Sequence, residues 1–250
     1  MQQRGIQIEA KPFMVTRDAL NTIAGVHGLA AMVRDEELRV RWCDDAFASF
    51  CDIPREKLLG TTLRDILPEP AAREREAVIR EVINTGEPAT FLQFGCDKRL
   101  VCRILPLDSE SFGYRGVLCI VREGDLADIE EPTSKPRRVL RTAYLDDLAL
   151  LTKSELRTLY DLALGASNND IAERQFRSVR TIENHVESIH RKLGTSTRSA
   201  LVRFATERGV HGFTPQEWDL IVEGASETRR APGPAIPPCH THRGPPPAVN

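Results

Sequence analysis

One face of a helix predicted over residues 179–193 carries side chains of the types that read DNA bases. These side chains form one polar stripe: Arg180, Glu183, Asn184, Glu187 and Arg191. Asn pairs with adenine, and Glu accepts a hydrogen bond from the amino group of cytosine. Arg supplies positive charge that attracts the phosphate backbone. The stripe therefore predicts a surface that reads base edges in the major groove of double-stranded DNA.

The opposite face of this helix is apolar and must lie against a core. Its residues recur at the period of an α-helix: Val179, Ile182, Val186, Ile189 and Leu193. A helix held in this way can place its polar face in a major groove. The side chains that flank the polar face could reach phosphates; they are Thr181, His185, Ser188 and Lys192.

Three further short helices must position this one. Thr152 and Glu155 form a capping box for the first, which ends at Gly165. Ser167 is an N-cap for the second, and Ser178 for the third. The fourth runs from Thr197 to Gly209. The pattern predicts a four-helix domain that contains a helix-turn-helix.

This stretch resembles the LuxR-type helix-turn-helix domain of bacterial transcription regulators. The matching segments, in order, are LTKSE at 151–155, G-x-SNNDIA at 165–172, S-x-x-TIENH at 178–185, RKLG at 191–194 and R-x-x-L at 198–201. The resemblance implies that Glu183, Asn184 and Glu187 face the bases. It also implies that Thr181, His185 and Lys192 hold the DNA backbone. Asn169, in the second helix, completes the predicted DNA-binding set.

The sequence departs from the family at positions 183 and 187, which are acidic where many relatives place Lys. One hypothesis is that Glu183 selects a cytosine. The alternative is a solvated helix face, on which Arg180 pairs with Glu183 and Glu187 pairs with Arg191. Under either reading, much of the attraction to DNA must come from Arg180, Arg191 and Lys192.

The N-terminal region alternates strands and helices. Strands are predicted at 29–34, 38–42, 88–95, 99–106 and 115–122, and helices at about 44–52, 54–59, 62–66 and 71–84. This order resembles a PAS domain. The matches are V-R-D at 33–35, D-D-A-F-A-S-F at 44–50, P-R-E-K-L-L-G at 54–60 and I-x-x-V-I-x-T-G-E-P at 79–88. The expected fold class is α+β: a five-stranded antiparallel sheet with helices, followed by the four-helix domain.

No cofactor is evident in this region. It lacks the asparagine-cysteine-arginine signature of flavin photosensors, and His27 is its one histidine. Its cysteines lack CxxC spacing: Cys43, Cys51, Cys96, Cys102 and Cys119. We expect those on strands to be core residues. PAS domains sense small molecules, cofactors or redox state, or dimerise. A small-molecule ligand and a thiol- or cofactor-sensing role both stay open.

Positive and negative residues are unevenly distributed along the chain. Residues 135–210 hold 14 Lys or Arg and 9 Asp or Glu, although the whole chain has a net charge of −2. A basic module beside an acidic one is typical of a DNA binder joined to a domain with another task. No signal peptide or membrane span is predicted. We therefore expect a cytoplasmic protein with reduced thiols.

Six segments are predicted along the chain: a leading segment with a pairing helix at 1–26, the PAS-like domain at 27–122, a basic linker at 123–147, the helix-turn-helix domain at 148–212, a short helix at 213–224 and a disordered Pro-rich tail at 225–250. In the linker, Arg137, Arg138 and Arg141 either touch phosphates or lie in a solvated hinge. A metal site at Cys239, His240 and His242 in the tail is not expected.

These observations predict a one-component transcription regulator and not an enzyme. The expected partners are double-stranded DNA and a second copy of the chain, with Leu201 and Phe204 at the dimer contact; RNA polymerase is left open. A two-fold dimer favours an inverted-repeat site. The alternatives are a phosphorylated response regulator, an acyl-homoserine-lactone sensor and a sigma-like promoter-recognition factor. No catalytic constellation or nucleotide-binding loop is visible.

Overall fold

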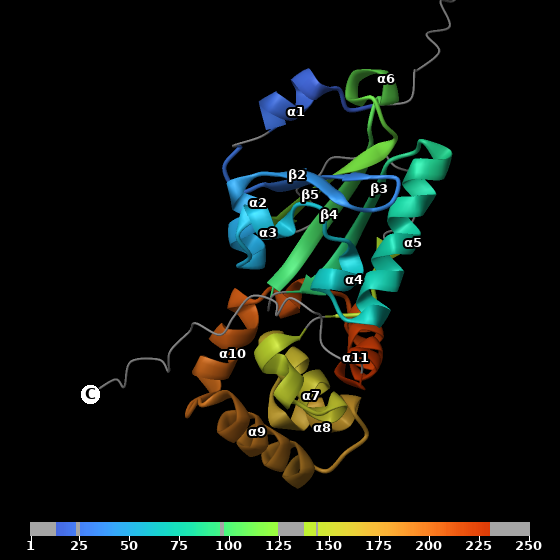
Figure 1. Ribbon diagram of the computed structural model, residues 1–250. Coiled ribbons are helices and arrows are strands. Elements are labelled where there is room, and N and C mark those ends of the chain that lie inside the picture. Colours follow the sequence, from blue (N-terminus) through green and yellow to red (C-terminus); the bar gives the residue numbers. More distant parts are fainter. Residues whose placement is uncertain (1–13, 24–25, 96–97, 125–137, 144, 231–250) are drawn as a thin grey trace, which may run out of the picture.

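The computed structural model describes residues 14–23, 26–95, 98–124, 138–143 and 145–230. An N-terminal sheet with helices lies against a C-terminal group of helices (Figure 1). The predicted α+β class is confirmed. The described residues do not include Arg137, Cys96 or the three potential metal ligands of the tail, Cys239, His240 and His242.

The N-terminal sheet contains the five predicted antiparallel strands. They are β1 (Ala30–Asp35), β2 (Val40–Cys43), β3 (Ala89–Gly95), β4 (Lys98–Pro106) and β5 (Gly116–Glu123). A sixth strand, β6 (Arg138–Val139), pairs in parallel with β3, and the order is β2-β1-β5-β4-β3-β6. The sequence predicted linker here, because a two-residue strand is too short to show alternation.

Helices cover one face of the sheet. They are α2 (Asp45–Cys51), α3 (Arg55–Leu58), α4 (Leu63–Ile66) and α5 (Glu69–Thr85). Asp44 caps α2 by accepting from the Phe47 amide at 2.7 Å, and it ties the helix to β1 by accepting from the Ala31 amide at 3.1 Å. At one end of the other face, α1 (Arg17–Ile23) and α6 (Ser109–Phe112) enclose a smaller core around Leu20, Leu105 and Leu118.

The C-terminal domain is built on the predicted caps. Its elements are η2 (Asp146–Leu150), α7 (Lys153–Ala163), α8 (Asn168–Arg174), α9 (Val179–Leu193), α10 (Arg198–Glu207), η3 (Val210–Gly212) and α11 (Pro215–Arg230). Thr152, Ser167, Ser178 and Thr197 each accept from the backbone amide three residues later. The helix expected at 213–224 continues to Arg230, so the disordered tail predicted from 225 does not begin there.

One of the hydrophobic clusters includes residues from both domains. Leu92, Phe94 and Val101, on the second face of β3 and β4, pack with Phe213 and Trp218. The Arg99 amide donates to the Arg208 carbonyl at 3.0 Å. Residues 138–143 also pack between the domains: Leu140, Thr142 and Ala143 are buried. The predicted solvated hinge is therefore wrong for this segment, because a charge run can lie over apolar neighbours that hold it in place.

The turn between α8 and α9 holds Phe176 in a left-handed conformation, with φ 51°. Its side chain is 93% exposed and so stabilises little. Phe176→Gly is expected to raise the free energy of unfolding by about 0.5–1 kcal/mol, because glycine adopts this φ without strain. Urea denaturation of the full chain measures the change.

The matched control for this prediction is Leu164→Gly. Leu164 is also exposed, but it has a right-handed backbone with φ −79°. This variant is expected to lose stability, because the flexibility of glycine has no compensating benefit there. Equal changes in the two variants would contradict the strain argument.

Candidate nucleic-acid interface and ligand cavity

Helix α9 is anchored by part of the predicted apolar stripe. Ile182 and Ile189 are buried in the core of the C-terminal domain, and Val186 and Leu193 are partly buried against it. Val179 is exposed, so its expected place in the core is wrong. It occupies the first position of α9, directly after the turn.

The predicted base-reading face is open to solvent. All five of its polar side chains are exposed: Arg180, Glu183, Asn184, Glu187 and Arg191. Helix α9 lies at the end of the molecule farthest from the sheet (Figure 1). Arg180 is 3.6 Å from Glu183, a loose pair, and Arg191 donates to Ser188 Oγ at 3.2 Å. The expected Glu187–Arg191 ion pair is absent among the described residues.

The side chains that flank the polar face of α9 already have partners on α7 or at its N-terminus. Lys192 Nζ lies 2.6 Å from Glu155 Oε2, in a carboxylate only 6% exposed. Ser188 also hydrogen-bonds Glu155, and His185 Nδ1 lies 3.4 Å from Thr158 Oγ1. These three residues hold α9 on α7. The Lys192 ammonium is thus engaged within the domain, and its expected phosphate contact stays a prediction.

Other residues extend the exposed surface around the helix-turn-helix. Asn169 is exposed on α8, and Thr181 Oγ1 lies 2.8 Å from Ser178 Oγ at the start of α9. Arg177 and Arg198 are exposed cations that sequence reasoning did not select. Arg198 donates to Asn168 Oδ1 at 2.8 Å. Their position beside the turn was the available signal, since basic residues there can reach phosphates.

The predicted dimer contact needs correction. Leu201 is 0% exposed and belongs to the core between α10 and α7, so it cannot face a second copy. Phe204 is partly buried, and the Arg208 guanidinium lies 3.5 Å from its ring centre. The spacing of apolar residues on α10 could not tell which side of the helix meets α7.

Glu155 couples the stability of the C-terminal domain to pH. Burial favours a raised pKa, but hydrogen bonds from Lys192, Ser188 and Thr152 outweigh it, so the pKa falls from 4.5 to about 2. The resulting stabilisation is complete above pH 4.5 and is lost as the pH falls through 2. Glu155→Gln is therefore expected to lower the free energy of unfolding by about 2–3 kcal/mol at pH 7, and by about half as much at pH 3.

Urea denaturation at several pH values measures this difference. Glu207→Gln is the control, because Glu207 lies on the exposed side of α10, 3.8 Å from Arg203. It should change stability by less than about 0.5 kcal/mol. A Glu155→Gln effect as large at pH 3 as at pH 7 would contradict the role of the carboxylate charge.

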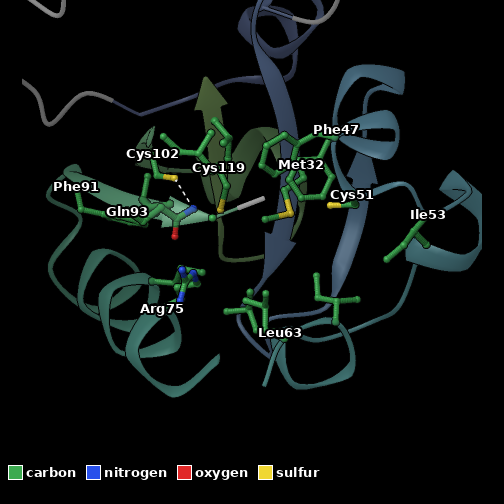
Figure 2. Close-up of a pocket in the computed structure, with 18 residues that line it drawn as sticks. Met32, Phe47, Cys51, Ile53, Leu63, Arg75, Phe91, Gln93, Cys102 and Cys119 are labelled. Carbon is green, nitrogen blue, oxygen red and sulfur yellow. Dashed lines mark hydrogen bonds between the residues drawn. The ribbon is translucent and has the colours of Figure 1, made fainter. Parts of the chain in front are cut away.

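A cavity of about 120 Å³ lies between the sheet and its helices. Its walls are mainly apolar and include Met32, Phe47, Phe91, Leu100, Ile104 and Val121. Figure 2 shows two polar side chains among them, Arg75 from α5 and Gln93 from β3. The sequence left a small-molecule ligand open without locating these residues, because α5 and β3 meet only in the folded domain.

Cys102 and Cys119, which line this cavity, are poor candidates for a redox sensor. Cys102 and Cys119 are buried, and burial raises the pKa of each thiol to about 12. The thiolate is the reactive form, so both are inert at neutral pH. Cys43 is also buried, and burial raises its pKa. In the described ranges no cluster of His, Cys, Asp and Glu could hold a metal.

The fold and the two sites define a class: a sheet domain with an internal cavity, joined to a helix-turn-helix domain. Residues 26–124 match the PAS fold, and residues 149–205 match the family described as bacterial regulatory proteins, luxR family. The chain therefore carries an N-terminal PAS-fold domain and a C-terminal helix-turn-helix domain of the luxR family. Both matches agree with the two domains that the sequence predicted. Residues 26–124, where two of the alternatives placed a receiver or sigma-like region, match the PAS fold instead.

The curated relatives include oxygen regulatory protein NreC. The Staphylococcus haemolyticus protein is 38% identical over 166 residues, which cover 64% of this chain and 66% of that protein. The Staphylococcus epidermidis protein is 26% identical over 138 residues, covering 55% of this chain and 61% of that protein. The chain thus spans less than two thirds of the length of these relatives.

Similar solved structures include a Vibrio cholerae VqmA dimer without target DNA, at 18% identity and a TM-score of 0.41, covering 82% of this chain and 93% of that one. A VqmA–ligand–DNA complex has 18% identity and a TM-score of 0.43, covering 82% of this chain and 92% of that one.

In the described part of this chain, no helix is both long enough and apolar enough to cross a membrane.

Proposed function

We propose that this chain is a one-component transcription regulator that binds double-stranded DNA through α9 and senses a small molecule in the PAS cavity. The observation that carries the proposal is the geometry of α9. Ile182 and Ile189 fix the helix against its own domain, while the opposite, hydrogen-bonding face is left open to solvent. A surface helix fixed in this way suits insertion into a major groove.

The DNA contacts divide into two groups in this proposal. Glu183, Asn184 and Glu187 read bases, and Glu183 accepts from a cytosine amino group. Arg180, Arg191, Asn169 and Thr181 contact or orient the backbone. His185, Ser188 and Lys192 act indirectly, by holding α9 against α7.

The regulator acts as a homodimer in the cytoplasm, on an inverted-repeat site, and RNA polymerase is a further partner. We propose the domain limits 27–122 for the sensor and 148–212 for the DNA-binding unit, with the extra helix serving as the dock between them. Support for the dock comes from Trp218 of α11, which contacts Phe94 of the sheet.

Selection of bound sequences from a random duplex pool tests the proposal. A shared inverted repeat should be enriched, and Asn184→Ala should weaken binding to it by about tenfold or more, the loss of one bidentate base contact. Arg203→Ala is the matched control, since Arg203 is exposed and lies on α10, not on the predicted base-reading helix. It should bind almost normally. Enrichment of no sequence by the full chain would sink the proposal.

Glu183→Ala isolates the cytosine hypothesis. Loss of the cytosine preference at one position, with binding otherwise kept, is the expected result. An unchanged base preference would show that Glu183 is only part of a solvated face paired with Arg180.

A further inference from the structure

We infer that the PAS cavity takes an uncharged molecule of about one aromatic ring that carries an O–H or N–H donor, and that Gln93 Oε1 accepts from this donor. The inference rests on the proposed sensing role of the cavity and names the chemical class of its ligand. Size, polarity and charge of the cavity each contribute one restriction.

The polar restriction comes from Gln93 on β3. Its side-chain amide is buried, with the residue only 9% exposed. Nε2 donates to Cys102 Sγ at 3.1 Å, whereas Oε1 has no hydrogen-bond partner within the described part of the chain. Figure 2 shows the amide among the residues that line the cavity. A buried carbonyl oxygen without a donor is unfavourable, so a ligand that supplies a donor is selected over one that does not.

The size restriction comes from the volume of about 120 Å³. A cavity of roughly 150 Å³ lined by Leu, Ile and Phe is known to bind benzene. The rings of Phe47 and Phe91 and the thioether of Met32 line the present cavity, and these flat or polarisable groups pack well against an aromatic ring. The space therefore suits one ring with small substituents and excludes a lipid chain or a nucleotide.

The charge restriction comes from Arg75 on α5. Its guanidinium is buried at the cavity wall, and no Asp or Glu is among the described lining residues. A cation would lie beside this positive charge without a counter-ion, at a high desolvation cost. An anion such as benzoate would present acceptors only, and so would oppose Gln93 Oε1. A neutral ring with a donor satisfies Gln93 Oε1 and places no second positive charge beside Arg75.

Thermal unfolding of the full chain with three matched probes tests the inference. Phenol has the donor, toluene has the same size without a donor, and benzylamine is a cation at neutral pH. Phenol should raise the Tm and bind at least tenfold more tightly than toluene, while benzylamine should give no shift. Equal shifts with phenol and toluene, or a preference for benzylamine, would overturn the inference, and so would the absence of any shift.

Gln93→Leu should reverse the preference, so that toluene binds at least as tightly as phenol. Its ligand-free Tm shows whether the variant folds, and Gln93→Met serves if it does not. Met32→Leu is the control, since it lines the same cavity but leaves the amide in place; its preference for phenol should persist. A Gln93→Leu variant that still prefers phenol would contradict the inference, because another residue would then accept from the phenol hydroxyl.

These outcomes are separate from those of the proposed function. DNA affinity is measured on the same samples with and without phenol. Phenol binding that leaves DNA affinity unchanged would contradict the sensing role while leaving the ligand class intact. DNA binding by a protein that responds to none of the probes would contradict the ligand class alone.

Discussion

Replacing Trp218 by alanine is expected to lower the free energy of unfolding by about 3–5 kcal/mol, the largest effect of any substitution considered. Trp218 lies on α11, is 1% exposed and contacts both domains. Its ring meets Phe94 of β3 edge-on at 5.7 Å and stacks on Tyr160 of α7 at 5.9 Å. Its Nε1 donates to the Leu156 carbonyl at 3.1 Å. Alanine would remove the ring that joins the sheet to α7 and leave a buried carbonyl without its donor.

Urea denaturation of the full chain, followed by fluorescence and by circular dichroism, measures this effect. The two signals should coincide in the wild type and separate in Trp218→Ala, because the domains lose their shared core. Leu220→Ala is the control on the same helix: Leu220 is exposed, and its loss should change stability by less than about 0.5 kcal/mol. Similar losses in the two variants would show that α11 is not the dock between the domains.

Glu74→Ala is expected to lower the free energy of unfolding by about 2–3 kcal/mol and to release the segment that joins the domains. Glu74, on α5, accepts from the amides of Arg141 and Thr142 at 3.0 and 2.9 Å and from the Thr142 hydroxyl. Alanine would leave two backbone donors without their acceptor. Hydrogen exchange of the Arg141 and Thr142 amides should rise in the variant.

Glu69→Ala is the matched control on the same helix. Glu69 makes an exposed pair with Arg73 at 2.6 Å, which is worth little to stability. Unchanged exchange at Thr142 in Glu74→Ala would contradict the view that Glu74 holds this segment. A loss of stability in Glu69→Ala as large as in Glu74→Ala would point to a general effect on α5.

The contact of Glu74 with residues 141–142 also connects the cavity to the segment that joins the domains. Arg75, the neighbour of Glu74, lines the PAS cavity and donates to the Thr142 carbonyl at 3.3 Å. A ligand that draws on Arg75 would therefore act on the same segment that Glu74 holds. Glu74→Ala is expected to reduce the effect of a cavity ligand on DNA affinity, because the segment would no longer follow α5.

Local sequence patterns were enough to place most helices and strands of both domains. The four helices α7 to α10 were predictable from a cap and an apolar period, because those signals lie within a few residues of one another. The five strands of the PAS sheet followed from alternation and turn residues in the same way. The ordered motifs of the helix-turn-helix then predicted the family that the comparison found.

The packing of whole elements fixes which side chains stay exposed and which bind partners within the protein. Lys192 was predicted to reach DNA, yet it pairs with Glu155, 37 residues earlier in the chain. Leu201 was predicted to face a second copy, yet it packs against α7. The same holds for the dock, where Phe94 meets Trp218, and for the cavity, where Arg75 and Gln93 converge. Such contacts depend on how whole elements pack, and no local spacing of residues records which partner a side chain will meet.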